Sequence, residues 1–198
     1  SEGLIAINGH LGSSIAYHLC NYVDSKDDSH WQLALDEAIW HAKTFSPNSN
    51  GEPRFFIEVQ RHGVEEQEAI NPYLVKLAKE LRLPIVCDND AHFLEECDWD
   101  AHDTLCCISM QKNKRDADRL TYSKELYVKS PSQMWKLFQD LPEAIENSAM
   151  IASRCNVSLD SNKNHAPVVR VTGPDSYEPF VDGDLTEWFK EHCQRFTL

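Results

Sequence analysis

The residue pair Asp90 and His92 has the types and the spacing to bind a metal ion. It follows an apolar run at 85–87, which Pro84 introduces and which predicts a short buried strand. Side chains alternate along an extended chain, so Asp90 and His92 share one parity and can reach a common point, whereas Cys87 should face the surrounding helices. A carboxylate oxygen beside an imidazole nitrogen suits a divalent metal of the zinc or manganese type.

Two more apolar runs end in histidine. Residues 4–9 predict a buried strand that leads into His10, and residues 55–63 predict a strand that ends near His62. On the second strand the even positions Glu58, Gln60 and His62 are polar and share one face. A single histidine at a strand end is more often a hydrogen-bonded loop residue than a ligand, but three such strand ends together favour a metal site. The candidate ligands are His10, His62, Asp90 and His92.

Helices between these strands would bring the three strand ends to one place. Apolar periodicity predicts helices at 13–22, 29–45 and 66–82. The resulting β-α-β-α-β-α order predicts a parallel sheet or barrel. In such folds the loops after the carboxyl ends of the strands form one rim, where ligands bind.

His102 lies on a further predicted helix, 95–110, and follows Asp98 by four residues. Three interpretations stay open: it orients a metal ligand through a hydrogen bond, it is a capping residue near the rim, or it is a partly buried helix histidine held by a carboxylate. Cys106 and Cys107 on the same helix are interpreted as small core residues, because nothing supplies the rest of a cysteine site.

Composition restricts the classes of function. The 198 residues include 32 acidic and 19 basic side chains, a formal net charge of −13, so nonspecific binding to nucleic acid through this surface is disfavoured. Seven cysteines without a C-x-x-C motif or a disulfide spacing indicate a reducing cytosol. No apolar run approaches 18 residues, so we expect no membrane span and a cytoplasmic location.

The second half of the sequence predicts architecture, and no catalytic residue type is arranged there. A short extended piece at 126–128 precedes a helix capped by Ser130 and another helix at 142–155. A polar connector at 160–183 leads to an amphipathic helix whose apolar side carries Leu185, Trp188, Phe189 and Phe196. A strand-like run begins almost at the first residue, and the last residues stop in or just after this helix, so we expect a piece of a longer protein.

The motifs at 56–63 (Phe-Ile-Glu-Val-Gln-Arg-His-Gly) and 89–94 (Asn-Asp-Ala-His-Phe-Leu) resemble the PHP (polymerase and histidinol phosphatase) domain of bacterial DNA polymerase III alpha subunits. Further segments match the same family in the same order, at 101–108, 127–131, 142–147 and 154–157. The resemblance covers roughly residues 3–160, and an ordered series of this kind is specific.

The resemblance implies an α/β fold that comprises only the later strands and helices of a distorted (β/α)7 barrel, with a C-terminal helical extension. Residues 1–160 would be the C-terminal part of the PHP domain. Residues 161–198 would be a connector and the first helix leading into the polymerase palm region. In some members the rim of this barrel binds divalent metals and supports 3′–5′ exonuclease or phosphoesterase chemistry, while in others the site is degenerate.

Carried over position by position, His62, Asp90 and His92 match late ligand positions of the family. His10 falls where many of these polymerases have cysteine, so it is either a substituted ligand or similar to the histidine of stand-alone phosphoesterases. Glu58 is characteristic of its strand but is not carried over as a ligand. It stays, with His102, a candidate for orienting the ligands.

Several family motifs have no match in this sequence: the early His-x-His, the Thr-Asp-His and the glutamate that follows. We therefore expect zinc or manganese to bind in the full-length parent, a DNA-directed DNA polymerase and thus a nucleotidyltransferase. Metal binding by this chain alone would be partial or absent, and no catalytic residue is assigned here.

Alternative functions remain open. The domain could be an inactive structural and interaction module that docks the proofreading subunit, or it could belong to an error-prone paralogue of the replicative polymerase. A stand-alone PHP phosphoesterase is a weaker alternative, because residues 120–160 resemble the polymerases. The resemblance implies a proofreading exonuclease and a sliding clamp as partners through the parent, and DNA bound through the parent rather than through this acidic chain.

Overall fold

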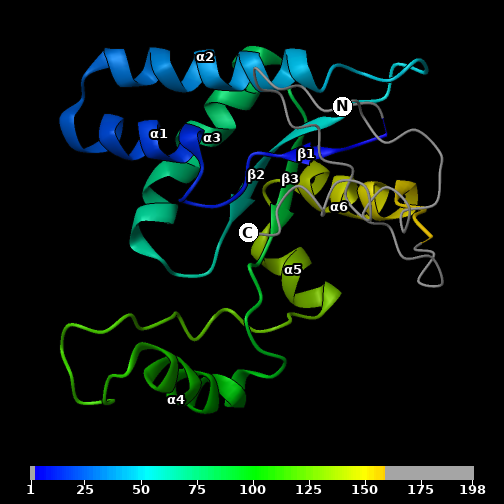
Figure 1. The fold of residues 1–198 in the computed structure, drawn as a ribbon. Helices are drawn as coiled ribbons and strands as arrows, with labels where there is room; N and C mark the ends of the chain where they lie inside the picture. The colour runs from blue at the N-terminus through cyan, green and yellow to red at the C-terminus, as the bar shows by residue number, and fades with distance from the viewer. Residues whose placement is uncertain (1–2, 159–198) are drawn as a thin grey trace, which may run out of the picture. The chain divides into compact units, whose positions relative to one another are not determined.

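The computed structural model describes residues 3–158 of the chain. Three parallel strands form one sheet in the order β1-β2-β3 (Figure 1). The described elements are, in chain order, β1 (Ala6–Ile7), α1 (Ser14–Ser25), α2 (Asp28–Thr44), β2 (Phe55–Gln60), α3 (Glu65–Leu81), β3 (Ile85–Asp88), the 3₁₀ turn η1 (Glu96–Asp98), α4 (Trp99–Met110), α5 (Pro131–Leu137) and α6 (Pro142–Arg154). They belong to one compact unit, Ser1–Asn156. The predicted α/β alternation and the parallel strands are confirmed, and the partial (β/α)7 barrel remains a prediction.

Side chains at the helix ends explain where the helices start and stop. The Ser13 side chain accepts a hydrogen bond from the backbone N–H of Ala16 and so caps α1. Ser130 and Gln133 form a reciprocal capping box at the start of α5. Helix α3 ends at Arg82, which adopts a left-handed conformation (φ 55°). These local signals are the ones that a sequence carries, and the predicted helices are confirmed to within a few residues at their ends.

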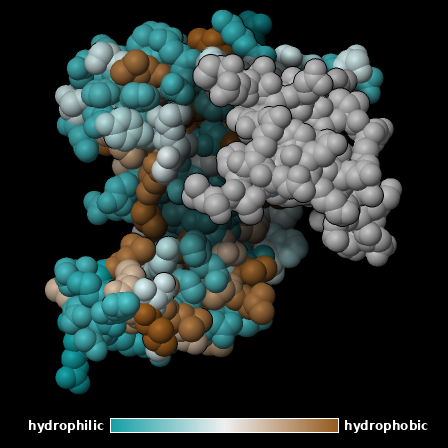
Figure 2. Space-filling model, viewed as in Figure 1, coloured by the Kyte–Doolittle hydropathy of each residue, from teal (hydrophilic) through white to brown (hydrophobic). Residues whose placement is uncertain are grey.

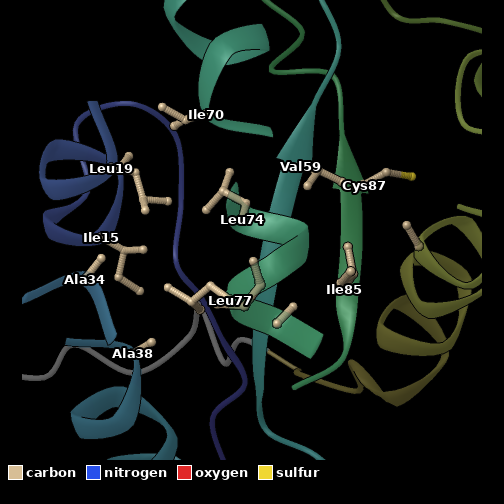
Figure 3. Packing of buried hydrophobic residues seen from close by; sticks show 14 of the residues in the cluster. Ile15, Leu19, Ala34, Ala38, Val59, Ile70, Leu74, Leu77, Ile85 and Cys87 are labelled. Atoms are coloured by element: carbon tan, nitrogen blue, oxygen red, sulfur yellow. The ribbon is translucent and has the colours of Figure 1, made fainter. Parts of the chain in front are cut away.

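Odd-numbered residues of β2 and β3 form the apolar core with the helices. Ile57, Val59, Ile85 and Cys87 are buried and belong to one cluster with residues of α1, α2, α3 and α6. Helix α3 packs on β2 and α6 packs on β3. Figure 3 shows side chains of α1 and α3, including Leu19 and Leu77, beside the strands of this layer. The prediction that Cys87 faces the helices is confirmed.

Several boundaries differ from the sequence-based expectation. Strand β1 is two residues long, and β2 ends at Gln60 rather than continuing to Gly63. The extended piece at 126–128 makes only an isolated bridge, between Phe93 and Tyr127. Regular pairing needs a partner strand at each position, which periodicity along one segment cannot report. The predicted connector and helix at 161–198 lie outside the described residues.

Helix α4 exposes part of its apolar surface. Leu105 and Ile108 are 65% and 69% exposed, and Figure 2 shows brown apolar surface in the part of the molecule that contains α4. Within residues 3–158, no helix has the length and apolarity needed to cross a bilayer.

Candidate metal centre

Buried polar side chains gather around the carboxyl ends of the strands. This sets the even-numbered face of β2 and β3 apart from the odd-numbered face, which is apolar. Strand register places Gln60 opposite Asp88 and Glu58 opposite Val86, so the polar character of the even face increases toward the ends of the strands. The buried polar residues of this region are Asn8, Glu58, Gln60, His62, Gln67, Asn71 and Asn89.

Three of these residues form a hydrogen-bonded row along the even face. The Gln60 amide nitrogen donates to the Glu58 carboxylate, and the Gln60 amide oxygen lies 2.9 Å from Nε2 of His62. An amide oxygen can only accept, so His62 Nε2 carries the proton in this contact. The other ring nitrogen, Nδ1, then carries the lone pair. It is buried and has no hydrogen-bond partner among residues 3–158.

Burial also keeps the His62 ring neutral. Desolvation lowers its pKa, while the nearby carboxylates of Asp90 and Glu68 act in the opposite direction. A neutral imidazole with an unshared lone pair is the form in which histidine binds a metal.

Glu58 sits in an environment that disfavours its negative charge. Burial, followed by the charge of Asp88, raises its pKa to about 7. The Gln60 hydrogen bond opposes this rise, and the Asp90 charge adds to it. Nearby carboxylates that repel one another in a desolvated place are stabilised by a cation. The backbone N–H of Glu58 donates to Oδ1 of Asn8 (2.5 Å), which ties the end of β1 to β2.

Asp90 and His92 meet as predicted, but for a different backbone reason. His92 Nε2 lies 3.3 Å from Asp90 Oδ2. Asp90 has a left-handed backbone (φ 48°), and β3 already ends at Asp88, so strand alternation does not continue through this pair. The two side chains come together through a turn, and both stay partly exposed to solvent.

His102 lies beside this pair through ring contacts. Its ring centroid is 5.7 Å from that of His92 and 5.2 Å from that of Tyr122. Cys106 Sγ lies 3.8 Å from the His102 ring nitrogens. His102 therefore packs against a candidate ligand, and no carboxylate of the described residues forms an ion pair with it. The alternative of a carboxylate-held helix histidine is thus not observed.

His10 lies on an exposed loop after β1. Its Nδ1 accepts a hydrogen bond from the backbone N–H of Gly12 (3.0 Å). In the described part of the chain, no hydrogen bond, ion pair or ring contact joins it to His62, Asp90 or His92. The polar residue at the end of β1 that does reach β2 is Asn8.

The segment after α4 is held against this edge by three partly buried hydrogen bonds from two side chains. Asn89 Nδ2 donates to the backbone carbonyls of Glu125 (3.0 Å) and Tyr127 (2.7 Å). Ser123 Oγ donates to the backbone carbonyl of His62 (2.5 Å). Sequence reasoning missed Asn89 and Ser123, because both contacts are made across distant parts of the chain. It also missed Gln60 as a site residue, although strand alternation places Gln60 between Glu58 and His62.

These residues fit a divalent metal in the type of their donor atoms. The fit rests on the buried, unpartnered Nδ1 of His62 and on the neighbouring carboxylates. Among residues 3–158, no three histidine, cysteine, aspartate or glutamate side chains are grouped closely enough to hold a metal ion by themselves. The described residues thus present donors without a complete ligand set.

Most of the chain is similar in sequence to known proteins. No protein family model matches it. It is 36% identical over 176 residues, 87% of its length, to a protein of Campylobacter jejuni named DNA polymerase III subunit alpha, of which it covers 14%. Proteins of the same name from Treponema pallidum and Borreliella burgdorferi are 37% and 35% identical over 80% and 79% of the chain, which covers 13% of each. The chain is therefore homologous to one short segment of these long subunits.

Proposed function

We propose that this chain is a segment of a bacterial replicative DNA polymerase, the DNA polymerase III alpha subunit, and that it forms the C-terminal part of a metal-binding PHP domain. The proposal is carried by one observation: a chain similar to these subunits over 87% of its length buries a polar row beside two candidate ligands at the ends of its parallel strands. The parent polypeptide would synthesise DNA in the cytoplasm. Its proofreading exonuclease and sliding clamp would be partners of that parent.

Each side chain would have a separate task in the metal site. His62 would offer Nδ1, while Asp90 and His92 would offer carboxylate and imidazole donors from the turn after β3. A divalent cation bound there supplies Lewis-acid polarisation of a phosphoryl oxygen, which is the chemistry that 3′–5′ exonuclease or phosphoesterase activity requires. His10 would join only if its loop turned from the Gly12 contact. The remaining ligands would come from other parts of the parent chain.

A second candidate function is an inactive module that docks the proofreading subunit. One observation favours it: Leu105 and Ile108 are exposed on α4, where a partner protein could cover them. Both functions belong to the same parent. They differ in whether the full-length subunit holds metal.

Metal content of the full-length subunit distinguishes them. Purified without chelators, the wild-type subunit should contain zinc or manganese, measured by inductively coupled plasma mass spectrometry. His62→Ala and Asp90→Ala should each weaken binding by roughly 10–100-fold or more, because each removes a donor. His18→Ala and Asp100→Ala are matched controls: His18 is a partly buried histidine on α1 and Asp100 an exposed residue of α4. A wild-type subunit without transition metal would exclude metal-dependent exonuclease or phosphoesterase activity at this site and leave the docking module.

A further inference from the structure

We propose that Gln60 is a positioning residue that selects the tautomer of His62 and so directs Nδ1, rather than Nε2, toward a bound divalent metal. This inference rests on the proposed metal site. It adds to that site a residue that touches no metal, and it specifies which atom of His62 binds.

The side-chain amide of Gln60 forms hydrogen bonds with both Glu58 and His62. Gln60 is 3% exposed. Its amide nitrogen donates to Glu58 and its amide oxygen lies 2.9 Å from His62 Nε2. The contact that Asn71 makes to this residue goes to the backbone carbonyl (2.7 Å), so it does not affect the orientation of the amide.

The direction of the row follows from the orientation of the Gln60 amide. Its nitrogen donates to the Glu58 carboxyl group and its oxygen lies on His62 Nε2, and an amide oxygen can only accept. The oxygen then requires a proton on Nε2. In a neutral imidazole this leaves the lone pair on Nδ1, the nitrogen that is buried without a partner.

Without Gln60 the ring would lose this constraint. The proton could occupy either nitrogen, and the ring could rotate. Groups that hold a ligating histidine through its second nitrogen typically contribute 10–100-fold to metal affinity. We therefore expect a substitution of Gln60 to lower metal affinity only when His62 is present.

The test measures Zn²⁺ affinity of the full-length subunit by competition with a chromogenic chelator. Gln60→Met keeps the side-chain volume and removes both hydrogen bonds, and we expect a 10–100-fold loss of affinity. Gln60→Glu keeps an acceptor for Nε2–H, and we expect affinity within a few-fold of wild type. Gln67→Met is the control, because Gln67 is an equally buried glutamine at the same edge that bonds Asn71 and not the histidine.

A double-mutant cycle separates positioning from general support of the fold. In a His62→Ala background, Gln60→Met should cause no further loss of affinity. Equal losses in both backgrounds would overturn the inference, as would a Gln60→Met subunit that binds zinc like wild type. If Gln60→Met fails to fold, Gln60→Glu decides alone, and a tenfold loss there contradicts the inference. A wild-type subunit that binds no zinc would instead refute the proposed metal site on which this inference rests.

Discussion

At the strand ends, the negative charge of a single buried carboxylate lowers the stability of the folded state. Glu58 is the clearest case, because burial and neighbouring carboxylates raise its pKa to about 7. Below about pH 7 the folded state therefore holds a proton that the unfolded state releases at the ordinary glutamate pKa of 4.5. Stability contributed by this proton is fully present below that value and is lost as the pH rises through 7.

Replacing this residue should change how stability depends on pH. In metal-free buffer, Glu58→Gln should gain stability relative to wild type as the pH rises from 5 to 8, approaching ~3 kcal/mol, because glutamine carries no charge to desolvate. Urea unfolding of the chain at several pH values measures this. Glu80→Gln, on the exposed part of α3, is the control. A constant difference between wild type and Glu58→Gln across this range would contradict the assignment.

At the scale of elements, one asparagine connects the sheet to the segment that follows α4. Asn89 is buried and donates to two backbone carbonyls of residues 125–127, while the backbone N–H of His92 donates to the carbonyl of Leu126 (2.8 Å). Residues 125–127, which follow α4 in the sequence, thus hold the turn that contains Asp90 and His92 in place. This connection explains how two partly exposed side chains keep a common geometry.

Loss of the connection should destabilise the chain and loosen the turn. Asn89→Ala should lower the free energy of unfolding by about 1–3 kcal/mol, because two hydrogen bonds to backbone carbonyls are lost. Urea unfolding measures this, and amide hydrogen exchange at residues 90–94 should quicken in parallel. Asn113→Ala, an exposed asparagine between α4 and α5, should change both little. Unchanged exchange in Asn89→Ala would show that another contact holds the turn.

At the scale of the whole unit, α5 and α6 close the apolar layer over the sheet. Phe138, just after α5, is fully buried in the same cluster as Val59 and Leu77. Its ring lies 4.9 Å from the Arg61 guanidinium, which also pairs with Asp140 (2.5 Å). One aromatic ring therefore joins the last helices to β2, which carries Glu58 and Gln60, and to the residues that directly follow it.

Truncating the Phe138 ring should lower the free energy of unfolding more than any substitution at the surface does. Phe138→Ala should lower the free energy of unfolding by about 3–5 kcal/mol, because it leaves a cavity in a packed core. Trp135→Ala removes a larger but half-exposed ring from α5, and it should lower the free energy of unfolding clearly less than Phe138→Ala does. Denaturant titration of both variants tests the order. A larger loss for Trp135→Ala would mean that α5 is anchored by its outer face.

The sequence by itself determined the alternation of strands and helices, the apolar odd face of β2 and the strand ends that collect histidine and carboxylate. These features arise from periodicity and capping, which act within one segment. It also carried the resemblance to DNA polymerase III alpha subunits, which the comparisons support, while the PHP domain stays a prediction. Only the tertiary structure decided that Asn8 rather than His10 reaches β2, that Asp90 meets His92 through a left-handed turn, and that Asn89 holds residues 125–127. Those outcomes depend on hydrogen bonds between distant segments, and a buried polar group takes whichever partner the folded chain brings to it.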